Sequence, residues 1–116
     1  MKKIYVAGPM TGRKEFNFPA FFAAEERLRR LGWIVFNPAK HDQESGIDVT
    51  GTTGNPAEIP AFSLREALAW DMSRICEADA IYMLHGWEHS SGARAEHALA
   101  NALKLQIIYE ADAVHS

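Results

Sequence analysis

The stretch "AIYMLHGWEHSSGARAEHALANALKLQIIYE", residues 80–110, decides the fold. It begins with a short apolar run that contains β-branched and aromatic residues, which indicates a buried strand. A glycine- and serine-rich segment then leads into a run with apolar residues at helical spacing, and "QIIYE" ends the stretch as a further strand. Strand, helix and strand in this order predict a βαβ unit with two parallel strands.

The rest of the chain repeats this alternation. "KKIYVAG" (2–8) and "WIVFNP" (33–38) predict two more strands. "NFPAFFAAEERLRRLG" (17–32) and "SLREALAWDMSRICEAD" (63–79) predict two more helices, the second opened by a capping box. The sequence therefore predicts an α/β protein with a small flavodoxin-like or Rossmann-like three-layer fold, in which helices cover a parallel sheet of four or five strands. Ligands bind such sheets beyond the carboxyl ends of the strands.

One segment does not match this pattern. Residues 38–62 show no helical or strand periodicity and are rich in glycine, threonine and proline. A loop of this length inside a compact domain is usually functional or disordered, so a lid over a site and a flexible excursion are both open. No repeat or linker interrupts the chain elsewhere, and residues 1–116 are predicted to form a single domain with a long loop at about 38–62.

Composition excludes several classes of protein. The 116 residues are 47% hydrophobic with a net charge of −3, and no basic cluster is long enough to follow a phosphate backbone, so duplex nucleic acid is not an expected partner. The single cysteine, Cys76, cannot form an intrachain disulfide. No apolar run approaches the roughly 20 residues of a membrane span, and no signal-peptide pattern opens the chain. We therefore expect a soluble, cytoplasmic protein without a membrane partner.

Two acidic residues lie where a helix is expected to face the core. Glu96 lies beside Leu99 on the apolar stripe of its helix, and Asp71 lies between Leu68 and Ile75 on the stripe of another. Burying either carboxylate without a partner is costly, so each must reach water, form an ion pair or belong to a site. Two carboxylates at corresponding edges of one parallel sheet favour a site. The alternative ion-pair partners are Arg65, Arg74 and Arg94.

A pair of carboxyl groups supplies a nucleophile and a general acid, which is the equipment for breaking a glycosidic bond. Glu96 lies near the start of a helix, whose partial positive charge favours the ionised form that a nucleophile needs. Asp71 lies in the middle of a helix among apolar neighbours, so we expect a raised pKa and a role as proton donor.

The neighbouring segments are less specific. Ser90, Ser91 and Gly92 directly precede a helix and form either an anion site or an ordinary helix cap. Trp87 is placed either to stack on a base or to pack in the protein. Three histidines occur nearby, but no cysteine joins them and the loop fixes no ligand geometry, so neither a metal nor another cofactor is expected. The three are His85, His89 and His97.

The motifs "IYVAGP" (4–9), "WD" (70–71), "CEADAIYML" (76–84) and "SSGARAEHALA" (90–100) together resemble the nucleoside 2-deoxyribosyltransferase superfamily. This superfamily also contains hydrolases that cleave the N-glycosidic bond of nucleoside 5′-monophosphates. The resemblance covers most of the chain apart from residues 40–62. It implies a flavodoxin-like domain that completes its site by forming a homo-oligomer.

The resemblance also implies roles for individual residues. Glu96 matches the glutamate that attacks the anomeric carbon, Asp71 the aspartate that hydrogen-bonds the base and handles its proton, and Tyr5 the tyrosine that orients the glutamate. Loop residues that line the pocket or surround the sugar are matched by Gly8, Met10, Gly86 and Gly92.

Ser90 bears on the kind of substrate. The position six residues before the nucleophile is acidic in the transferases that act on free nucleosides and is a phosphate-binding serine in the monophosphate hydrolases. A carboxylate repels a phosphate that a hydroxyl and helix N–H groups can hold. Ser90 therefore favours a nucleotide over a free nucleoside as the small-molecule partner.

These features predict an enzyme that cleaves the N-glycosidic bond of a nucleoside or nucleoside 5′-monophosphate through a covalent glycosyl-Glu96 intermediate, followed by hydrolysis or base exchange. An alternative is a non-catalytic nucleotide-binding or sensing module with the same fold. A third possibility is that Asp71 and Glu96 have a purely structural role, which predicts that both are salt-bridged on the surface.

Overall fold

A computed structural model of the chain describes residues 2–110, which form one sheet of four parallel strands in the order β2-β1-β3-β4. In this register Tyr5 lies between Phe36 of β2 and Ile81 of β3. The predicted parallel α/β fold is confirmed, with four strands and a flavodoxin-like topology. The strands are β1 (Lys3–Ala7), β2 (Ile34–Phe36), β3 (Ala80–Met83) and β4 (Gln106–Tyr109).

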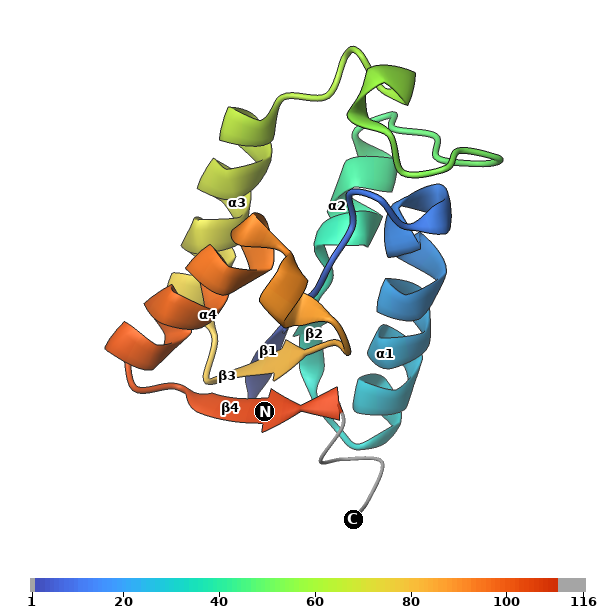
Figure 1. Cartoon of the computed structure of the whole chain (residues 1–116). Helices are drawn as coiled ribbons and strands as arrows, with labels where there is room; N and C mark the ends of the chain where they lie inside the picture. The colour runs from blue at the N-terminus through green and yellow to red at the C-terminus, as the bar shows by residue number, and fades with distance from the viewer. Residues whose placement is uncertain (1, 111–116) are drawn as a thin grey trace.

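The helices form a layer on each side of the sheet (Figure 1). α1 and the start of α2 pack on one face, and α3 and α4 pack on the other. The α-helices are α1 (Phe18–Arg30), α2 (Pro38–Glu44), α3 (Leu64–Glu77) and α4 (Ser91–Ala102), and the short 3₁₀ turns are η1 (Lys14–Asn17), η2 (Pro56–Glu58) and η3 (Trp87–His89).

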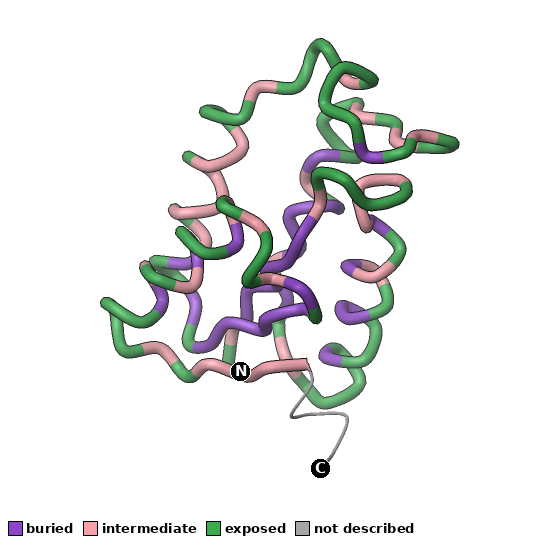
Figure 2. Tube along the Cα trace, in the orientation of Figure 1, coloured by how far each residue is buried: buried purple, intermediate pink, exposed green. Residues whose placement is uncertain are grey.

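Strand β1 is buried from both sides and supplies both halves of the core (Figure 2). Because successive side chains of a strand point to opposite faces, Ile4 and Val6 pack towards α1 while Tyr5 and Ala7 pack towards α3 and α4. All four side chains are inaccessible to solvent. The alternation therefore places the Tyr5 hydroxyl on the face that also receives α4.

The prediction of a loop over residues 38–62 is corrected at its start, where α2 follows β2 directly. The Asn37 side chain caps this helix by accepting hydrogen bonds from the N–H groups of Ala39 and Lys40. Pro38 occupies the first helical position, where its fixed φ and missing N–H cost nothing. Pro38 ends the strand, as the sequence indicated, and also begins a helix.

Residues 45–62 follow α2 and form a segment that we call the strap. It is fastened to the loop after β1, because Gly12 donates its N–H to the Gly54 carbonyl (2.8 Å) and Glu15 donates its N–H to the Thr52 carbonyl (3.0 Å). The Glu15 carboxylate in turn accepts from the N–H of Gly51 (2.9 Å). Two segments far apart in the sequence are therefore held side by side at the top of the molecule in Figure 1.

Gly54 is required for this close approach, and its substitution tests the strap. Gly54 has a φ of +93°, and a Cβ there would lie 2.3 Å from the Arg13 carbonyl oxygen. We expect Gly54→Ala to lower the free energy of unfolding by at least about 1 kcal/mol more than Gly51→Ala. Gly51 is the matched control because its φ is also positive (+74°) but an added Cβ would meet nothing within 4 Å. Equal losses in urea titrations of the two variants would contradict this role.

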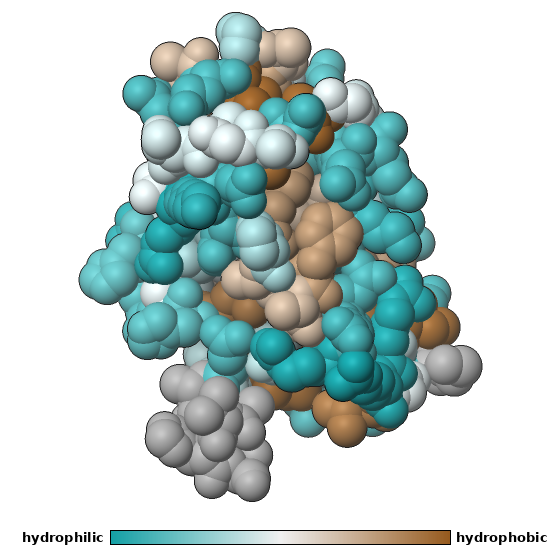
Figure 3. Space-filling view, turned by 90° about the vertical axis from the view of Figure 1, so that its right-hand side faces the viewer, coloured by the Kyte–Doolittle hydropathy of each residue, from teal (hydrophilic) through white to brown (hydrophobic). Residues whose placement is uncertain are grey.

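Among residues 2–110, five large apolar side chains are exposed on the surface. No helix in this described part of the chain combines the length and apolar character needed to cross a bilayer. On the face in Figure 3, apolar side chains gather near the middle, with hydrophilic ones around them. The exposed apolar residues are Leu31, Ile34, Phe62, Leu64 and Leu103.

Candidate active site

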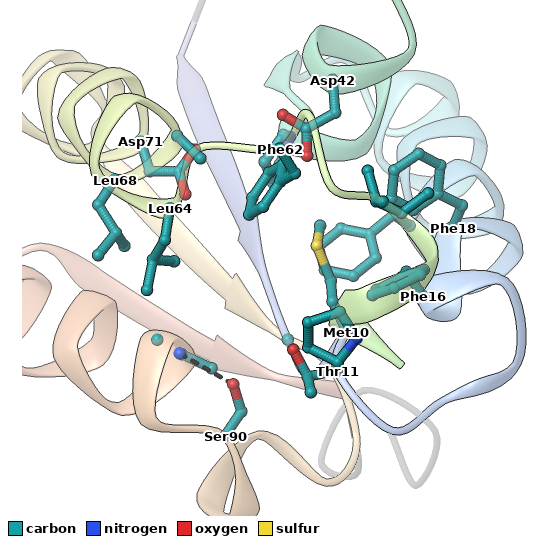
Figure 4. A pocket seen from close by; sticks show the side chains of 18 of the residues that line it. Met10, Thr11, Phe16, Phe18, Asp42, Phe62, Leu64, Leu68, Asp71 and Ser90 are labelled. Carbon is teal, nitrogen blue, oxygen red and sulfur yellow. Dashed lines mark hydrogen bonds between the residues drawn. The ribbon is translucent and has the colours of Figure 1, made fainter. Parts of the chain in front are cut away.

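A cavity of about 550 Å³ opens where the strand order reverses. The chain runs from β1 outward to β2 and then returns past β1 to β3, so the connections leave the carboxyl ends of β1 and β3 in opposite directions. Such a switch point is the usual ligand site of open parallel sheets. The walls come from the loop after β1, the start of α1, α2, the strap, α3 and the start of α4 (Figure 4).

Glu96 contributes a buried carboxylate to this cavity. It lies on α4, is only 5% exposed, and accepts a hydrogen bond of 2.8 Å from the Tyr5 hydroxyl to its Oε2 atom. Burial raises the pKa of Tyr5 well above its ordinary value, and the nearby carboxyl groups raise it further. The phenol therefore stays protonated and fixes the position of the Glu96 side chain as a hydrogen-bond donor.

Asp71 reaches the same cavity from α3, so the two predicted carboxyl groups converge. Burial raises the pKa of Glu96 well above its ordinary value, the Asp71 carboxylate raises it further, and the hydrogen bond from Tyr5 acts in the opposite direction. Burial also raises the pKa of Asp71, while hydrogen bonding with Glu96 and Tyr5 and the charge of His41 lower it. Two such groups titrate as a pair that readily keeps one proton.

The expected difference in ionisation between the two residues requires a correction. The pKa of Asp71 is raised, as predicted, but the pKa of Glu96 is raised as well. Glu96 lies more than one turn inside α4, where the effect of the helix N-terminus has faded and burial outweighs it. The hydrogen bond from Tyr5 therefore favours the ionised form of Glu96, whereas a negative charge on Asp71 disfavours it.

The first turn of α4 forms a polar edge of the cavity. Ser90 is the N-cap, and its Oγ accepts a hydrogen bond of 3.2 Å from the N–H of Ala93. Ser91 and Gly92 also line the cavity, and their N–H groups have no hydrogen-bond partner within residues 2–110. Free N–H groups at the start of a helix attract anions. The serine pair is therefore a helix cap that leaves donors available for a ligand.

A model of the domain of unknown function DUF4406 matches residues 2–109. The chain belongs to the DUF4406 family. No curated protein and no solved structure matches the chain.

In this DUF4406 chain, most of the predicted site residues line the cavity. Gly8 permits the loop after β1 to pass close to Leu84, the residue that follows β3, since a Cβ there would lie 2.7 Å from the Leu84 Cβ atom. Tyr5 contacts the site through Glu96. The predicted residues in the wall itself are Gly8, Met10, Asp71, Ser90, Ser91, Gly92 and Glu96.

Two residues that the sequence associated with a ligand lie elsewhere. Gly86 is outside the cavity wall and, with a φ of +87°, forms the turn that begins η3. Trp87 packs in the protein, where its ring stacks on His97 with the centroids 4.2 Å apart. Of the two readings open for Trp87, packing is the one that the structure supports.

The opposite wall is aromatic and apolar and was not predicted. Glu15, Phe16 and Asn17 form three consecutive left-handed residues, a conformation that costs about 1 kcal/mol for each side chain. Hydrogen bonds hold this turn, including one from Asn17 Nδ2 to the Pro9 carbonyl (3.0 Å). As a result, Phe16 lies in the cavity wall beside Phe18 and Phe21.

Asp42 is the functional candidate that the sequence reasoning missed. It lies on α2 within the supposed loop, is 9% exposed, and lines the cavity. The signal that predicts its helix is Asn37 followed by Pro38, an N-cap and a first-turn proline. Within residues 2–110, no group of three acidic, histidine or cysteine side chains is placed to hold a metal ion.

Proposed function

We propose that this protein cleaves the N-glycosidic bond of a nucleoside or nucleoside 5′-monophosphate, as members of the nucleoside 2-deoxyribosyltransferase superfamily do. The observation that carries the proposal is the buried Tyr5–Glu96 hydrogen bond with Asp71 beside it, at the wall of a cavity of about 550 Å³. One proton on the carboxyl pair gives one carboxylate and one carboxylic acid, the two forms that glycosidic cleavage needs.

In the first step, a Glu96 carboxylate oxygen forms a bond to the anomeric carbon while the bond from that carbon to the base nitrogen breaks. The electron pair leaves with the base, which takes a proton from Asp71. In the second step, water attacks the same carbon, gives a proton to Asp71 and releases Glu96, or a second base replaces the water. Two displacements retain the configuration of the sugar.

A nucleotide is the favoured substrate because of the first turn of α4. The free N–H groups of Ser91 and Gly92 and the hydroxyl groups beside them are suited to a phosphate, and no acidic residue occupies position 90. A 5′-phosphate bound there would hold the sugar near Glu96, one turn further along the same helix. Ser90 and Ser91 are therefore proposed phosphate-binding residues.

The test is incubation of the protein with a panel of deoxynucleosides, ribonucleosides and their 5′-monophosphates, followed by chromatography of the products. Release of a free base supports cleavage. A new nucleoside or nucleotide, formed only when a second base is added, distinguishes transfer from hydrolysis. Binding of nucleotides without release of any base, even over long incubation, would instead favour the nucleotide-sensing alternative.

The purely structural reading of the two carboxyl groups has no support in the site. That reading requires ion pairs on the surface, but Glu96 is buried and neither carboxyl group forms a salt bridge within residues 2–110. Arg74, one of the suggested partners, pairs with Glu77 instead (3.0 Å). The predicted homo-oligomer and cytoplasmic location remain predictions.

Tyr5 is proposed as a positioning residue, and Tyr5→Phe tests that role. We expect kcat to fall about 10- to 100-fold with little change in KM, because the hydroxyl holds Glu96 and does not touch the substrate. The hydrogen bond from Tyr5 lowers the pKa of Glu96, so its loss should also move the acid limb of the pH–rate profile to higher pH. A variant with an unshifted pH profile would show that Tyr5 only fills space.

A further inference from the structure

Asp42 is a buried carboxyl group that the proposed mechanism does not use. It lies on α2, and its carboxyl group points into the cavity (Figure 4). Only 9% of the residue is exposed, yet no side chain or N–H group within residues 2–110 donates a hydrogen bond to its carboxylate. Its carboxylate is therefore free to accept a hydrogen bond from a ligand in the cavity.

An unpartnered carboxylate in this position is costly for the free protein. Burial raises the pKa of Asp42 to about 7, and the charge of Asp71 contributes to the increase. A buried carboxylate that receives a hydrogen bond from a ligand recovers much of this cost, whereas a ligand that presents a lone pair adds to it. Asp42 therefore selects between ligands by their hydrogen-bond donors.

The position of Asp42 identifies the part of the ligand that it meets. Asp42 and Ser90 lie at opposite sides of the cavity in Figure 4, with Asp71 on the wall between them. A phosphate at the start of α4 is kept away from the Asp42 carboxylate by charge repulsion. With the phosphate near Ser90 and the sugar near Glu96, the base is the part that extends towards Asp42 and the phenylalanine wall.

We propose that Asp42 accepts a hydrogen bond from the exocyclic amino group of the base and so selects amino-bearing bases over their oxo counterparts. This inference rests on the proposed function. The exocyclic group projects from the edge of the ring, where a side chain of the cavity wall can contact it. An amino group donates to the carboxylate, while an oxo group in the same place opposes two lone-pair-bearing oxygens. Cytosine is thus preferred to uracil, and adenine to hypoxanthine.

The test is calorimetry with protein that carries Glu96→Gln, so that no ligand is consumed. We expect deoxycytidine 5′-monophosphate to bind at least about tenfold more tightly than deoxyuridine 5′-monophosphate at pH 8. Adding Asp42→Asn should bring the ratio close to one, because an amide both donates and accepts. Glu44→Gln is the matched control on the same helix, since Glu44 is exposed and outside this cavity, and it should leave the ratio unchanged.

A ratio that stays the same in the Asp42→Asn protein, a preference for the oxo member, or binding of neither nucleotide would overturn the role of Asp42. The proposed function is tested separately by base release from the wild-type protein. Base release with an unchanged binding ratio removes only the role of Asp42. An Asp42-dependent ratio without any base release removes only the catalytic proposal.

Discussion

Replacing Glu96 with glutamine should lower base release by at least about 10³-fold while the protein stays folded. The amide is nearly the same size as the carboxyl group but cannot attack the anomeric carbon, so the first displacement fails. Glutamine also keeps an oxygen that can accept the hydrogen bond from Tyr5. The measurement is the rate of base release by chromatography, with circular dichroism and thermal unfolding to show that the fold is intact.

Glu88→Gln is the matched control for this experiment. Glu88 lies on η3, a few residues before α4, and it is exposed and outside the cavity wall. Its substitution should leave base release unchanged. Mass spectrometry of wild-type protein quenched during turnover should find the sugar attached to the peptide that contains Glu96. If the Glu96→Gln protein keeps more than about a tenth of the wild-type rate, Glu96 is not the nucleophile.

The second large effect concerns stability and pH. The pKa of Asp42 rises from the ordinary value of 3.8 in the unfolded chain to about 7 in the folded protein. Between these values the folded state holds a proton that the unfolded state has released, so this group makes stability fall as pH rises from about 4 to about 7. The loss is complete above about pH 7 and, because the carboxylate keeps some contact with solvent, is on the order of a few kcal/mol at most. Asp42→Asn should therefore raise stability at pH 8 and change it little at pH 4.

The quantity to measure is the difference in unfolding free energy between the Asp42→Asn variant and wild type, from urea titrations at several pH values. The difference is needed because carboxylates with lowered pKa values, such as Glu25 and Asp48, change stability in the opposite direction. Asp48→Asn is the control, since the exposed Asp48 carboxylate accepts a hydrogen bond from the Thr50 N–H. It should give no gain at pH 8. Parallel curves for Asp42→Asn and wild type would show that Asp42 is well solvated.

The fold and the centre of the site follow from local patterns in the sequence. Alternating strands and helices predicted the parallel sheet, because only a crossover connection joins parallel neighbours. Asp71 and Glu96 were recognisable because each interrupts an apolar stripe with period 3.6. A charged residue that breaks a regular pattern is visible in one sequence, and here both such residues reached the same cavity.

The parts of the site that the sequence did not predict lie in segments without a repeating pattern of apolar residues. Helix α2 has only seven residues, too few for a repeating stripe, and so Asp42 was hidden in an apparent loop. Phe16 enters the wall through a left-handed turn of three residues without glycine, which no propensity rule anticipates. The path of the strap depends on hydrogen bonds to the segment around Gly12, which is about forty residues away in the chain.

The strap has a consequence for how this protein can diversify. The proposed reacting groups lie on β1, α3 and α4, whereas much of the cavity wall above them comes from the strap between α2 and α3. Because strap residues line the cavity, we expect substitutions in the strap to change which ligands fit while Tyr5, Asp71 and Glu96 keep their positions. If the proposed function holds, new specificities can therefore arise by changes in one surface segment while the proposed catalytic residues stay the same.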